Sequence, residues 1–114
     1  MSKNSNINDP LEPDVSSLEK LALETAKIPW KELQYFFATG HAVYISTELD
    51  LVRVAQHVAN DDKQVIENWM QTDKIAPVSN DQARDWYNND SKVWAVVVKP
   101  WILIQDDTQG RRNQ

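Results

Sequence analysis

The segment Val93–Gln105, VWAVVVKPWILIQ, is the most apolar part of the chain and the strongest indication of its fold. Successive side chains of a strand point to opposite faces. One face of this segment would carry Val93, Ala95 and Val97, and the other Trp94, Val96 and Val98. Since both faces are apolar, the pattern predicts a strand that is covered on both sides. Pro100 has no N–H to donate, so the strand bends there or passes to an edge of the sheet.

Five helices are expected ahead of this segment, and each has a marker at its N-terminus. They begin at the capping box Ser16–Glu19, at Pro29, at Thr47, at Asp61 or Asp62, and at the capping box Ser79–Gln82. Gly40 suits the end of the second helix, because glycine accepts the positive φ that commonly terminates helices. In the fourth helix, the spacing turns Val65, Ile66, Trp69 and Met70 inward.

Two shorter segments also predict strands. Residues 41–46 alternate, with Val43 and Ile45 on one face, and residues 74–78 are extended around Pro77. The chain therefore predicts an α+β fold, with about five helices around a small sheet of two to four strands. Residues 16–105 form the single compact domain. The polar segments 1–15 and 106–114 are expected to be disordered tails.

Composition excludes several classes of function. There is no cysteine, which rules out thiol catalysis and cysteine-bound zinc and favours a reducing, cytoplasmic setting. Gly40 and Gly110 are the only glycines, too few for a P-loop, a dinucleotide fingerprint or a nucleophile elbow. The net charge of −5 argues against nucleic acid and anionic membranes as partners. No secretory signal or membrane span is recognisable, and no cofactor or metal is expected.

Candidate binding residues cluster around one lysine. Lys99 is the only charge between Val93 and Ile104, so it either reaches solvent or pairs with a carboxylate. Glu24 and Glu32 are the candidate partners, because they flank the corner at Trp30. Most of the five tryptophans fall on apolar helix or strand faces and predict core packing, whereas Trp101, directly after a proline, is the best candidate to line a pocket or an interface.

The remaining titratable residues predict structural contacts. His57 and Asp61 lie four residues apart, which predicts a surface His–Asp contact rather than a metal site. Asp61 and Asp62 could form a carboxylate dyad, but capping of the following helix is the preferred interpretation.

Three separated blocks resemble a known bacterial family. They are ETAKIPWKELQYFFATG (Glu24–Gly40), LDLVRVA (Leu49–Ala55) and WAVVVKPWILIQ (Trp94–Gln105). In this order they are similar to domain-of-unknown-function family 2288, over roughly Leu18–Gln105. The resemblance implies a small stand-alone bacterial protein of the cytoplasm. It carries no activity, cofactor or site residue to transfer.

Three functional hypotheses follow. The first is a non-enzymatic binding or regulatory module that acts through contacts with a protein partner or a second copy. The second is an enzyme with a carboxylate–lysine site at Lys99, Glu24 and Glu32. The third is a helix-turn-helix nucleic-acid binder, suggested by apolar residues that crudely resemble those of the motif, with one extra residue in the turn, and disfavoured by the acidic second helix. Those residues are Ala55, Val58, Ala59, Ile66 and Trp69.

Overall fold

The computed structural model describes residues 11–107, with side chains from residue 18 onward. Within this range the chain forms five α-helices, one short 3-10 helix (η1) and five strands. Their order is α1 (Leu11–Glu24), β2 (Ala26–Pro29), η1 (Trp30–Leu33), α2 (Gln34–Ala38), β3 (Ala42–Ile45), α3 (Leu51–Ala59), α4 (Lys63–Gln71), β4 (Ile75–Pro77), α5 (Asn80–Asn88), β5 (Lys92–Val98) and β6 (Trp101–Asp106). None of these helices is long and apolar enough to cross a bilayer.

The strands form one mixed sheet in the order β2-β5-β6-β3-β4. The decisive segment folds back on itself at Lys99-Pro100, so that β5 and β6 pair antiparallel. Among the strands of residues 11–107, only β3 and β6 pair in parallel. The predicted α+β class is confirmed, but the sheet has one strand more than the largest number expected. The additional strand is β2, which pairs with β5 where a helix N-terminus was expected at Pro29.

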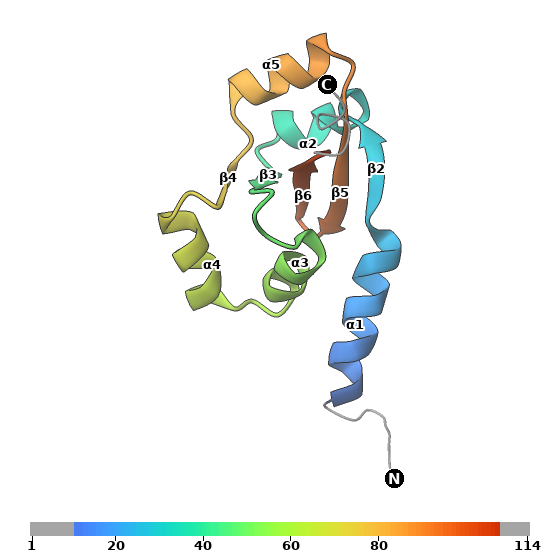
Figure 1. The fold of residues 1–114 in the computed structure, drawn as a ribbon, viewed down its shortest axis with the longest axis vertical. Helices are drawn as coiled ribbons and strands as arrows, with labels where there is room; N and C mark the ends of the chain where they lie inside the picture. The colour runs from blue at the N-terminus through green and yellow to red at the C-terminus, as the bar shows by residue number, and fades with distance from the viewer. Residues whose placement is uncertain (1–10, 108–114) are drawn as a thin grey trace.

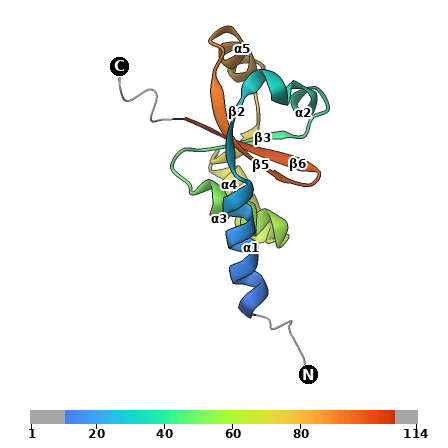
Figure 2. The ribbon, with the colours of Figure 1, turned by 90° about the vertical axis from the view of Figure 1, so that its right-hand side faces the viewer.

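Helices cover both faces of the sheet, as Figures 1 and 2 show. On one face, η1, α2 and α5 pack over a core that includes Trp30, Trp86 and Ile104. On the other face, α1, α3 and α4 pack over a core that includes Ile45, Val54 and Leu103. The alternation of β6 explains the division, because Ile102 and Ile104 enter the first core and Leu103 enters the second.

The helix termini agree only partly with the expected markers. Ser79 and Gln82 form the predicted capping box of α5, and Gly40 has the predicted positive φ of 81° after α2. The cap of α3 is Asp50 rather than Thr47, because the Asp50 side chain accepts from the backbone N–H groups of Val52 and Arg53. The capping box expected at Ser16 is also wrong, since α1 already begins at Leu11.

The expected boundaries at residues 16 and 106 both fall within elements of secondary structure, α1 and β6. Residues 11–15 belong to α1, and β6 ends at Asp106. Beyond the strand, the Asp107 carboxylate lies 2.9 Å from the ammonium of Lys27 in β2. The rest of the two predicted tails, residues 1–10 and 108–114, lies outside the described residues.

Both outer strands of the sheet carry a proline at an outward-facing backbone position. In β4 the backbone groups of Lys74 and Val78 form hydrogen bonds with β3. The backbone N–H of Ile75 and the backbone nitrogen of Pro77 therefore point away from the sheet edge. In β2 the hydrogen bond from the Trp30 N–H to the Ser91 carbonyl shows which residues bond to β5. By the alternation of an antiparallel pair, the backbone N–H of Lys27 and the backbone nitrogen of Pro29 point away from the sheet edge. Each edge therefore lacks one N–H donor, which disfavours the addition of another strand.

Candidate binding groove

An apolar groove of about 350 Å³ lies between α4 and the part of the sheet made by β3, β4 and β6. We call it the α4 groove. Its size is at the lower end of the range of protein ligand sites, roughly 300–1,000 Å³. Its apolar residues come from four separate elements and the end of α3: Val43, Ile45, Val58, Ile66, Met70, Ile75, Ala76, Pro77, Trp101 and Leu103.

The floor of the α4 groove belongs to the rigid core. Ile45, Ile75 and Leu103 are buried in the cluster beneath α3, so their positions are fixed by packing. The rim is different. Met70 is 52% exposed and Trp101 is 39% exposed, although both are large apolar residues. The prediction that Met70 points inward is therefore wrong, since its side chain stays accessible at the mouth of the groove.

The wall formed by α4 packs on both α3 and β4. No residue of α4 is fully buried, but Trp69 packs edge-on against the ring of His57 with centroids 5.4 Å apart. The Nδ1 atom of His57 lies 2.8 Å from the Asp62 carboxylate. The contact expected between His57 and Asp61 is thus made by Asp62 instead. Asp61 has a φ of 58° in the turn between the helices, and its side chain lines the groove.

Three charged residues border the α4 groove, one in the turn before α4, one at the start of α4 and one in its middle. They are Asp61, Lys63 and Glu67, and their charges sum to one negative charge. Asp61, Lys63 and Glu67 are exposed. The groove therefore combines an apolar floor with a rim on which carboxylates outnumber ammonium groups.

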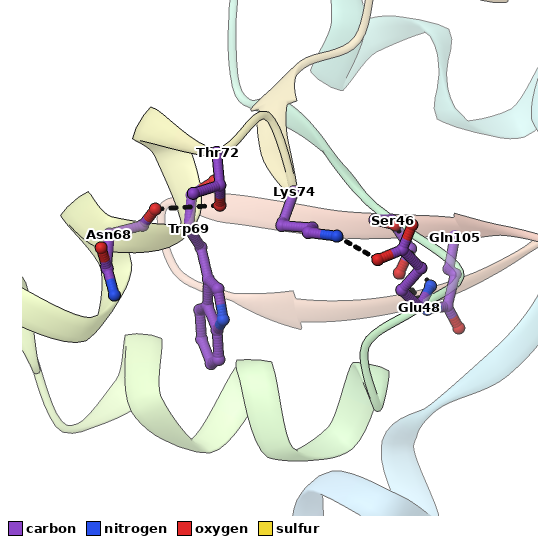
Figure 3. Close-up of polar contacts among 7 residues, drawn as sticks. All are labelled: Ser46, Glu48, Asn68, Trp69, Thr72, Lys74 and Gln105. Atoms are coloured by element: carbon purple, nitrogen blue, oxygen red, sulfur yellow. Dashed lines mark hydrogen bonds and ion pairs between the residues drawn. The ribbon is translucent and has the colours of Figure 1, made fainter.

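Polar contacts organise the loop that follows β3, next to the groove residue Ile45. Lys74, just before β4, forms an ion pair with Glu48 of this loop (Figure 3). The Gln105 side-chain amide donates to the carbonyls of Ser46 and Leu49, at 2.9 and 2.8 Å. At the end of α4, the hydroxyl of the C-cap residue Thr72 donates to the Asn68 carbonyl in the last turn of the helix. The contacts of Lys74 and Gln105 fix the backbone next to the floor residues Ile75 and Ile45.

A second cavity of about 420 Å³ lies between α5 and the ends of β5 and β6, and it is polar. Its lining includes Asp85, Lys92, Asp106 and Asp107. The Asp106 carboxylate accepts the indole N–H of Trp86 at 2.9 Å and the hydroxyl of Tyr44 at 3.3 Å. This cavity therefore contains a structural hydrogen-bond network that joins α5 and β3 to β6.

The predicted carboxylate–lysine site is not assembled. Lys99 is exposed in the β5–β6 turn, and none of the ion pairs among the described residues involves it. Glu24 and Glu32 are also exposed. Glu32 follows Pro29, which pairs with Lys92, so Glu32 and Lys99 lie toward opposite ends of β5. Seven strand residues separate those ends by on the order of 20 Å.

The two candidate tryptophans have different positions. Trp30 is 1% exposed and packs against Trp86, with centroids 5.0 Å apart, so it is a core residue. Trp101 lines the α4 groove, and its ring lies 5.6 Å from that of His41. Within residues 11–107, no three His, Asp or Glu side chains come together in a way that could hold a metal ion.

The fold and the groove define a small α+β domain with an open apolar surface on one face of its sheet. Residues 17–106 match the family model described as protein of unknown function (DUF2288), and the chain belongs to this family. Its structure is similar to the NMR solution structure of PA1075 from Pseudomonas aeruginosa. The TM-score is 0.70 at 37% sequence identity, over 90% of this chain and 93% of the other. No curated protein matches the sequence.

Proposed function

We propose that this protein is a non-enzymatic binding module that acts through protein contacts, and that the α4 groove accepts an apolar segment of a partner protein. The observation that carries the proposal is the exposure of Met70 and Trp101 over an apolar floor. Large exposed apolar residues that gather in one place commonly mark interaction sites. Tryptophan and methionine are also enriched in the centres of protein interfaces.

The shape of the groove favours a macromolecular partner over a small molecule. Small-molecule sites usually enclose most of their ligand, about 70–90% of its surface. Here two of the largest lining side chains are themselves exposed, so the groove covers one side of its occupant. Methionine has a flexible, polarisable side chain that adapts to the shape of a partner. A bound protein segment would cover Met70 and Trp101 from the open side.

The helix-turn-helix alternative has limited support. Helices α3 and α4 are joined by a three-residue connection, residues 60–62, as in that motif. However, the segment from Asp61 to Lys74 contains four acidic residues and two lysines. Such a helix would be repelled by phosphates. In addition, α4 forms one wall of the apolar groove, which suits contact with a protein better than contact with a nucleic acid.

The proposal places the protein in the bacterial cytoplasm. PA1075, the similar protein whose structure has been solved, comes from a bacterium. A chain without cysteine is suited to a reducing compartment.

Selection of peptides from a random library on the immobilised full-length protein tests this function. We expect enriched peptides to carry apolar residues at helical or alternating spacing, and their binding to be lost with Met70→Glu. Tyr35→Glu is the matched control, because Tyr35 is 75% exposed on α2, on the opposite face of the sheet. A library without enriched apolar peptides, or peptides that bind the Met70→Glu variant equally well, would contradict the proposal.

A further inference from the structure

We infer that the segment bound by the α4 groove is an amphipathic helix whose apolar face is bordered by lysine or arginine. This inference rests on the proposed function and adds the conformation and the charge of the partner. The conformation follows from the geometry of the sheet edges and of the groove, and the charge follows from the residues at the rim.

A partner strand has poor access to the sheet. Pro77 removes an outward N–H from β4, the edge strand beside the groove, and leaves Ile75 as the outward-facing donor of that strand. Pro29 removes the corresponding donor at the opposite edge. Because strand addition depends on backbone hydrogen bonds, neither edge offers a regular ladder.

A partner helix matches the groove better. Most of the lining residues belong to α4 and to the sheet, with Val58 at the end of α3 and Asp61 in the turn before α4. An apolar helix face is recognised through side chains of this kind. One wall is itself a helix, and two packed helices need an axial separation of about 8–10 Å. The volume of about 350 Å³ admits a few anchoring side chains while the rest of the partner helix stays outside.

The charge of the partner follows from the rim. Asp61 and Glu67 contribute two carboxylates, against one ammonium from Lys63. The whole chain carries a net charge of −5, so its long-range field also attracts a cationic segment. Charges at the rim of an interface mainly select partners and accelerate association, and the apolar floor provides the larger share of the affinity.

Two defined peptides test the inference by fluorescence anisotropy with the full-length protein. Both are helices of about four turns with the same leucine face, and their polar faces carry lysine in one and glutamate in the other. We expect the lysine peptide to bind at least about fivefold more tightly at low salt, because exposed ion pairs with Asp61 and Glu67 each contribute modestly.

Two substitutions distinguish the effect of the charges at the rim of the groove from the effect of the net charge of the protein. Glu67→Lys should reduce the preference for the lysine peptide to about twofold or less. Glu32→Lys makes the same change of charge on η1, across the sheet from the groove, and should leave most of the preference intact. If both variants reduce the preference equally, the peptide responds to overall charge and the inference is wrong.

The remaining outcomes distinguish this inference from the proposed function. Equal affinity of the wild type for both peptides, with both lost in Met70→Glu, would overturn the charge inference and leave the groove as a binding site. Binding of both peptides that is unaffected by Met70→Glu, or no binding of either peptide, would overturn the proposed function as well. Analytical ultracentrifugation of the free protein should show a monomer. A dimer abolished by Met70→Glu would identify a second copy as the occupant and overturn the inference.

Discussion

At the scale of single residues, Asp106 joins three elements. Its carboxylate accepts hydrogen bonds from Trp86 in α5 and from Tyr44 in β3, while Asp106 itself ends β6. Trp86 is 7% exposed, so its indole N–H has little access to water. A buried donor that loses its acceptor costs more free energy than the net gain from one hydrogen bond.

Asp106→Ala should therefore lower the free energy of unfolding by about 1–3 kcal/mol. Asp85→Ala is the matched control, because Asp85 lines the same polar cavity but is exposed, and it should change stability by no more than about 0.5 kcal/mol. Urea denaturation measures both values. Equal stability of the two variants would show that the Asp106 network contributes nothing to folding.

At the scale of elements, sequence patterns located most of the helices and strands. The Ser79–Gln82 capping box, the positive φ of Gly40 and the apolar segment that became β5 and β6 depend on local chemistry, which the sequence states directly. Strand β2 was missed because its four residues include an exposed lysine, Lys27, and a proline, Pro29, and have no apolar alternation. Residues 26–29 form a strand because they pair with β5, and this pairing depends on the tertiary structure rather than on the local sequence.

The edge prolines also belong to this scale. Combining Pro29→Thr with Pro77→Thr restores an outward N–H on both outer strands. We expect the double variant to self-associate with rising concentration in analytical ultracentrifugation, because both edges become competent for pairing.

Ala76→Thr provides the control, since it places a threonine in β4 without adding an outward donor. It should behave like the wild type at every concentration. A double variant that stays monomeric would show that the prolines do not protect the edges.

At the scale of the whole molecule, the α4 groove depends on the strand order. Trp101 was recognisable as a pocket or interface residue because it follows a proline beside an apolar strand. Val43, Met70 and Pro77 were not recognisable as its neighbours. They lie in separate segments that meet because β6, β3 and β4 are adjacent and α4 packs on α3. Helical periodicity alone predicts that the Met70 side chain points inward, whereas in the structure it is exposed at the mouth of the groove.

If the proposed function is correct, protein partners bind at the α4 groove. The most direct test is a ¹H–¹⁵N correlation titration of the full-length protein with the lysine-bearing amphipathic peptide. We predict that the largest shift changes occur at Val43, Met70 and the Trp101 indole N–H, and that Tyr35 across the sheet stays unchanged. Shift changes centred on Tyr35 or on the polar cavity around Asp106, or an unchanged spectrum, would contradict this claim.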